Sequence, residues 1–310
     1  MALQFQPFRR RVARGSKWLV DAAAGRFAVG LHKLTRRLDL ERSAERFGRV
    51  LQRIGPLRSE HGVGRANLRA AFPEKSAEEI EAILLQVWDN LGRVSVEYAH
   101  LDRLWDFDLN RPNSGRIEVT EGTIERCLQL RDDGKPALVF AAHRANWELP
   151  ALAGPLHNVD SAVLYRMPSV GRIAAAVRDM RTGCMGTLIP TGIGAPSAAA
   201  AALDRGAHVG MLVDQHFTHG VDVDFFGRRC KANPMIARLA RHYDCPIHGT
   251  RAVRLPGYRF RMELTEPIVP AHDAEGRIDV QGTMQTITAV VEGWVREHPG
   301  QWLWLHRRWR

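Results

Sequence analysis

The sequence predicts an α/β fold in which a mixed central sheet is flanked by helices, with a basic amphipathic helical region at the N-terminus. Between residues 116 and 213, short apolar segments alternate with helical ones, which is typical of a largely parallel sheet. Further on, Pro256-Gly257 separates two strand-like segments, which indicates an antiparallel hairpin. No linker divides residues 116–310 into two cores, and 45% hydrophobic residues suffice for one large core.

Residues 1–70 predict basic helices with breaks near Gly55-Pro56 and at residues 61–64. Charged residues interrupt the apolar stretch 18–38, so it is too polar to span a bilayer, and it lacks the cleavage site of a signal peptide. Four apolar residues share one helical face: Phe27, Leu31, Leu34 and Leu38. A helix lying in the membrane interface and a helix packed on the protein's own core explain this pattern equally well.

A long helix follows this region. Ser76 and Glu79 have the spacing of a capping box. Apolar residues then recur at helical spacing: Ile80, Ile83, Leu84, Val87, Leu91, Val94 and Tyr98. Such a stripe predicts packing against the core.

The alternating part of the chain contains five predicted strands, at residues 116–120, 137–142, 161–165, 187–190 and 209–213. Helices are predicted at residues 122–131, from 147 onward, at 168–181 and at 196–203. Asn233-Pro234 is suited to begin a helix that runs to Tyr243. The hairpin strands cover 247–255 and 258–265, and a last helix covers 280–297.

The net charge and the cysteine content limit the classes of binding partner and the cellular compartment that we expect. The net charge of +10 and pI of about 10.1 suit nucleic acid, an anionic lipid surface or an acidic protein. The terminal arginines lack the interleaved aromatic residues of an RNA-binding motif, which argues against nucleic acid. The four cysteines are scattered, which favours a reducing compartment and argues against a zinc site.

The segment ALVFAAHRANWELP (137–150) is the best candidate for chemistry. His143 follows a buried strand, where α/β sheets form their ligand crevices. Asn146 is suited to cap the next helix, which would put Glu148 near His143, able to accept from one imidazole nitrogen. The other nitrogen would then take a proton from a substrate hydroxyl. A satisfied histidine beside a capped helix explains the same residues, since a two-residue motif is weak evidence.

Two other motifs are weaker evidence for a functional site. Five residues have side chains that could bind a metal ion, but their spacing matches no compact ligand motif: Asp214, His216, His219, Asp222 and Asp224. Thr191-Gly192-Ile193-Gly194 lacks the rest of a phosphate-binding loop and predicts a turn. We therefore expect neither a metal nor a cofactor.

ALVFAAHRANWEL resembles the H-x-x-x-x-[D/E] block of the bacterial lipid A late acyltransferases, which add secondary lauroyl or myristoyl chains. Further blocks follow the family's order over about residues 60 to 310: RANLRAAFPEKSAEEIEAILLQVWDNLG (65–92), LYR (164–166), GMLVDQ (210–215), VDFFGR (223–228) and HPGQWLWLHRRWR (298–310). The tryptophans of the last block suit an interfacial belt or a closed core. No single block is specific to this family, but their occurrence together and in this order is.

The resemblance implies a fold like that of the glycerolipid acyltransferases, with His143 as general base and Glu148 as its orienting partner. It also implies that Arg166 could meet a phosphate or carbonyl oxygen. Asp214 and Gln215 match the family's D-Q block, for which a structural hydrogen-bonding corner is the favoured interpretation. The substrate-binding set is therefore Asn146, Arg166, Asp214 and Gln215.

The family implies acyl transfer from an acyl carrier protein thioester to a hydroxyl of a lipid A precursor, at the cytoplasmic face of the inner membrane. Acyl carrier protein is acidic, which agrees with the net charge of +10. Acyl-CoA as donor, and another glycolipid or a lysophospholipid as acceptor, remain open. So does a non-catalytic, basic membrane-binding module. We assign residues 1–70 to a membrane-associating region and 71–310 to an acyltransferase domain.

Overall fold

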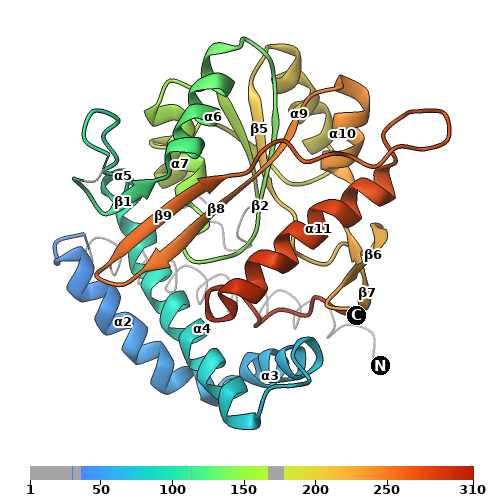
Figure 1. Ribbon diagram of the computed structural model, residues 1–310. Coiled ribbons are helices and arrows are strands. Elements are labelled where there is room, and N and C mark those ends of the chain that lie inside the picture. Colours follow the sequence, from blue (N-terminus) through green and yellow to red (C-terminus); the bar gives the residue numbers. More distant parts are fainter. Residues whose placement is uncertain (1–29, 31–35, 113, 167–177) are drawn as a thin grey trace, which may run out of the picture.

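The computed structural model describes residue 30 and residues 36–112, 114–166 and 178–310 (Figure 1). Most of the predicted apolar face of the N-terminal region lies outside these residues, as does most of the helix predicted at 168–181. Of that face, Leu38 is described, and half of its surface is exposed.

A mixed seven-stranded sheet forms the centre of the molecule, as predicted, in the order β1-β9-β8-β2-β5-β3-β4. Strands β8, β2, β5, β3 and β4 are parallel to one another, whereas β9 is antiparallel to β8 and β1 is parallel to β9. The strands are β1 (Ile117–Val119), β2 (Leu138–Ala141), β3 (Ser161–Tyr165), β4 (Thr187–Pro190), β5 (His208–Leu212), β8 (Ile247–Leu255) and β9 (Arg259–Leu264).

Helices cover both faces of this sheet (Figure 1). Against one face lie α6 (Glu121–Asp132) and α7 (Leu149–Leu156); against the other lie α9 (Ala195–Asp204), α10 (Met235–Tyr243) and α11 (Val280–Glu297). Phe140 of β2 stacks on Trp294 of α11, with ring centroids 5.6 Å apart. The second face is thus closely packed.

The helix α4 (Ala77–Glu97) starts at the predicted capping box, in which Ser76 and Glu79 each accept a hydrogen bond from the other's backbone N–H. It packs against α2 (Leu40–Ile54) where Gly48 and Gly92 meet, since a Cβ on Gly92 would lie 2.8 Å from the Gly48 Cα. Side chains at these positions would therefore push the two helices apart.

The two predicted breaks in the N-terminal region had different outcomes. The break at Gly55-Pro56 is confirmed, because α2 gives way there to a 3₁₀ turn, η1 (Gly55–Leu57). The break at residues 61–64 was wrong, because α3 (Ser59–Ala71) runs through it. Gly64 serves close packing there, as its Cβ would lie 2.7 Å from Leu84 Cδ2. Among the described helices, none combines the length and apolarity needed to cross a bilayer.

The hairpin of β6 (Val221–Phe225) and β7 (Arg228–Ala232) was not predicted. Its first strand, Val-Asp-Val-Asp-Phe, alternates apolar and acidic residues as a half-buried strand does, but its acidic residues were considered only as possible metal ligands. The C-terminal tail packs beside this hairpin: Trp309 stacks on Phe225, with ring centroids 5.6 Å apart. Trp302 and Trp304 are 1% and 0% exposed, so these two tryptophans close the core.

Candidate active site

His143 and Asp214 come together because their strands are neighbours. β2 and β5 pair in parallel with Ala141 opposite Leu212, and each of the two polar residues follows two positions later. The Asp214 carboxylate accepts from the His143 backbone N–H at 2.8 Å through Oδ2, and its Oδ1 lies 2.8 Å from His143 Nδ1. Asp214 is thus the carboxylate that orients the imidazole.

The C-terminal tail completes this corner. Leu303 donates its backbone N–H to the His143 carbonyl at 3.0 Å, and Ala145 donates to the Gln301 carbonyl at 2.7 Å. These bonds place the Trp302 indole so that its Nε1–H donates to Asp214 Oδ2 at 2.7 Å. Asp214 therefore serves as the structural corner predicted for the D-Q block and as the partner of His143.

Burial and charge shift the pKa values of this pair in opposite directions. Burial raises the pKa of Asp214, but the charge and hydrogen bonds of His143 outweigh it and hold that pKa well below its usual range. Burial lowers the pKa of His143, but the charge of Asp214 and its hydrogen bond outweigh this and raise it. An ionised Asp214 accepts from Nδ1–H, so the lone pair of neutral His143 lies on Nε2.

Nε2 of His143 faces Gln215, whose side-chain nitrogen lies 3.3 Å away. Gln215 also lines the adjoining cavity. The indole of Trp147 stands 5.4 Å from the imidazole, measured between ring centroids.

Glu148 was expected to orient His143, and the structure corrects this. Ala145 adopts a left-handed backbone conformation (φ 44°), and the chain turns after it. Both carboxylate oxygens of Glu148 are engaged by Arg181, with Nε 3.0 Å from Oε2 and Nη2 bonded to Oε1. Nearness in sequence suggested the wrong carboxylate for the imidazole, because strand pairing brings Asp214 closer.

Sequence reasoning missed Arg181 as a site residue. Its guanidinium lies 5.4 Å from the Tyr98 ring centroid and 5.7 Å from that of Tyr165. Burial lowers the pKa of Arg181, but the charge and hydrogen bond of Glu148 outweigh it and raise that pKa. The separation of 33 residues between Arg181 and Glu148 left no local pattern from which to find the pair.

Asn146 is fully buried and does not line the cavity, contrary to its assignment to substrate binding. Its amide donates to Glu97 Oε2 at 2.9 Å, and its oxygen accepts from the Glu148 backbone N–H at 3.1 Å. Glu97 in turn holds both terminal nitrogens of Arg254, at 2.6 and 2.9 Å. Asn146 therefore fastens the turn before α7 to α4.

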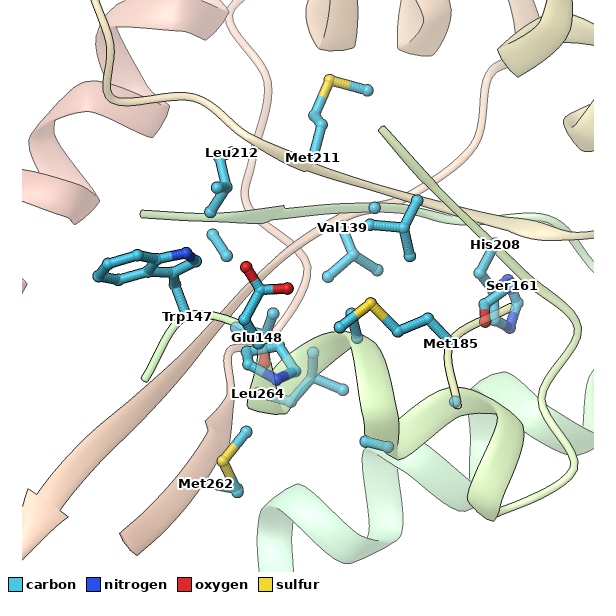
Figure 2. Close-up of a pocket in the computed structure, with 18 of the residues that line it drawn as sticks. Val139, Trp147, Glu148, Ser161, Met185, His208, Met211, Leu212, Met262 and Leu264 are labelled. Carbon is cyan, nitrogen blue, oxygen red and sulfur yellow. The ribbon is translucent and has the colours of Figure 1, made fainter. Parts of the chain in front are cut away.

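A cavity of about 820 Å³ adjoins His143, between the sheet and the layer of α6 and α7. Glu148 and Trp147 lie toward one end of it, and Ser161 and His208 lie toward the other (Figure 2). Side chains between these ends are mostly apolar, and Arg166 also contributes to the lining while remaining exposed. Ligand sites span roughly 300–1,000 Å³, so the cavity is large enough for a lipid chain.

Among the residues that the structure describes, the five possible metal ligands between Asp214 and Asp224 do not form a group that could hold a metal ion. Asp214 is engaged by His143 and Trp302, and Asp222 pairs with Lys231 at 3.1 Å.

A histidine paired with a carboxylate beside a mostly apolar cavity, on an α/β sheet, is suited to proton transfer on a largely apolar substrate. Residues 7–310 match the family described as bacterial lipid A biosynthesis acyltransferase. The match covers essentially the whole chain, so this protein belongs to that family. No match was found among curated proteins.

Proposed function

We propose that the protein transfers a fatty acyl chain from an acyl carrier protein thioester to a hydroxyl group of a lipid A precursor. Membership of the family supports acyl transfer in lipid A biosynthesis. The observation that carries the proposal for the site is the His143–Asp214 pair at the end of an apolar cavity. Glu148 has a different role in this proposal from the one first expected.

The proposed step is direct transfer. Nε2 of His143 takes the proton of the acceptor hydroxyl while that oxygen attacks the thioester carbonyl carbon. The carbon–sulfur bond then breaks, and the imidazolium returns the proton to the leaving thiolate. Asp214 stabilises the imidazolium and fixes its orientation. A positioned base of this kind contributes roughly 100- to 10,000-fold.

Two arginines supply positive charge near this step. Arg181 lines the cavity and is held by Glu148, so we propose that Glu148 is a positioning residue for Arg181. Arg166 is exposed where it lines the cavity, and we propose that it meets phosphate or carbonyl oxygen. Both assignments use the affinity of a guanidinium for anionic oxygen.

The net charge of +10 favours an acidic protein donor such as acyl carrier protein. We also propose that the protein works at the cytoplasmic face of the inner membrane, on which its basic N-terminal region would lie. Acyl-CoA with another glycolipid or a lysophospholipid is the second candidate, since the same histidine chemistry serves either donor.

A donor comparison with the purified full chain tests the proposal. Lauroyl- and myristoyl-acyl carrier protein and the matching CoA thioesters are offered with a lipid A precursor, and products are read by mass spectrometry. We expect a mass increase of one acyl chain with the carrier protein and none with His143→Ala. Equal use of CoA would favour the second candidate. Absence of transfer from every thioester would leave a membrane-binding module as the better account.

A further inference from the structure

Three neighbouring strands form one wall of the cavity, in rows. Since alternate residues of a strand face the same side, every second residue of β2, β5 and β3 points toward the cavity. Gly210 of β5 is in register with Val139 of β2 and with Val163 of β3, and all three line the cavity. One row farther from His143, His208 is in register with Ser161, and both line it too.

Gly210 therefore stands at the middle of this wall without a side chain. A Cβ built there would meet nothing closer than 3.9 Å, the distance to the Ala162 carbonyl oxygen and to Val163 Cγ2. Gly210 is also not among the glycines with positive φ, so the backbone does not require glycine. Neither crowding nor backbone conformation requires glycine at this position. The absence of a side chain at Gly210 instead leaves space in the cavity.

The row beyond Gly210 brings the side chains of His208 and Ser161 to the cavity wall. His208 is only 7% exposed, and both ring nitrogens are engaged: Nδ1 by the Ala137 backbone N–H at 3.1 Å and Nε2 by the Leu130 carbonyl at 2.8 Å. These bonds hold the ring in place against the far end of the cavity, next to Ser161 (Figure 2). A fixed ring is a firm obstacle to a chain that has passed Gly210.

We propose that Gly210 sets the length of acyl chain that the protein accepts, by letting the chain pass the middle of the cavity to an end formed by His208 and Ser161. This inference rests on the proposed function, in which the chain's carbonyl lies beside His143.

Strand geometry gives the expected lengths. Val139, in the Gly210 row, precedes His143 by four residues, and Ala137, in the His208 row, precedes it by six. At roughly 3.3 Å per residue, the Gly210 row lies about 13 Å from His143 and the His208 row about 20 Å. An extended hydrocarbon chain advances about 1.3 Å per carbon, given a C–C bond of about 1.5 Å. The Gly210 row is thus reached at about carbon 10, and the His208 row at about carbon 15. Chains of 12 or 14 carbons pass Gly210 and fit.

The test is a series of substitutions at Gly210, assayed with saturated acyl thioesters of 8 to 16 carbons. Gly210→Leu should lower the turnover ratio of 14-carbon to 8-carbon donor by at least about tenfold, since pockets discriminate single methylenes by roughly 10- to 200-fold. Gly210→Ala should shift the preference less. Gly293→Leu is the matched control, because Gly293 is exposed on α11 with nothing within 4 Å of its built Cβ. It should keep the wild-type preference.

Two results would overturn the proposal: an unchanged chain-length profile in Gly210→Leu, or an equal loss for all lengths in a variant whose melting temperature is kept. Binding of free fatty acids of the same lengths, measured by calorimetry, separates this inference from the proposed function. If no thioester is used by the wild type, the proposed function fails. A loss of 14-carbon but not 8-carbon binding in Gly210→Leu would still support the channel, and equal binding would contradict it.

Discussion

Two carboxylates near the same cavity are used in different ways. Asp214, 71 residues from His143 in sequence, meets the imidazole directly, whereas Glu148, five residues away, meets Arg181. Asp214 is held at a strand end by the His143 backbone and the Trp302 indole. Glu148 is held at a turn by a guanidinium with two hydrogen bonds. Strand pairing therefore determines which carboxylate meets the imidazole.

The largest effect is expected from removal of the proposed base. His143→Ala should lower kcat by roughly 100- to 10,000-fold, because no group remains to take the acceptor's proton. The fold should survive, since the side chain is partly exposed to the cavity. Steady-state kinetics beside circular dichroism measure both. Near-normal kcat in a folded variant would mean that another group is the base.

Asp214→Asn should have the next largest effect, a loss of about 100- to 1,000-fold in kcat. The amide cannot stabilise the imidazolium, and its NH₂ group facing Nδ1 would favour the wrong tautomer. Asp214→Glu is the companion variant, which keeps the charge but displaces it. If Asp214→Asn retained full turnover, the Asp214 contact would be structural only.

Glu148→Gln should act chiefly on stability. Removing one partner of a buried ion pair costs about 3–5 kcal/mol of unfolding free energy, because Arg181 is left buried with its charge uncompensated. Denaturant unfolding of Glu148→Gln, Arg181→Gln and the double variant measures the coupling. The double variant should lose less than the sum of the two single ones. Additive losses would show that the pair is not coupled.

Trp302→Phe should have the smallest effect. It removes the indole hydrogen bond to Asp214 and leaves an aromatic ring in the core, at a cost of about 1–3 kcal/mol. Asp214 keeps both contacts with His143, so kcat should fall by less than tenfold at a temperature where the variant is folded. A loss as large as that of Asp214→Asn would make the indole bond essential to the base.

Much of the fold could be predicted from the sequence because its signals are local. Apolar runs, the Ser76–Glu79 capping box and Pro256-Gly257 each lie within one element, and the last helix was predicted with the observed bounds Val280–Glu297. The hairpin β6–β7 was missed although Val221–Phe225 alternates apolar and acidic residues, because Asp222 and Asp224 were considered only as possible metal ligands. The prediction of a break at residues 61–64 was wrong because Gly64 allows close packing against Leu84, which is distant in the sequence.

The site was predicted only in part, for the same reason. His143 could be found from its place after an apolar run, and Asp214 and Gln215 from their match to the family's D-Q block. Which carboxylate meets the imidazole depends on strand order, β2 beside β5, and no local pattern records it. The pairing of Arg181 with Glu148 likewise joins segments that only the folded chain brings together.

The pH dependence of kcat/KM tests the central claim, that His143 acts as a base tuned by Asp214. Activity requires neutral His143, so the rate should rise with pH through the pKa of this histidine, which Asp214 raises above the ordinary 6.5. In Asp214→Asn the raising charge is lost while burial remains, so the acidic limb should move to lower pH. Glu148→Gln should move it far less. An acidic limb that stays in place in Asp214→Asn would contradict the account.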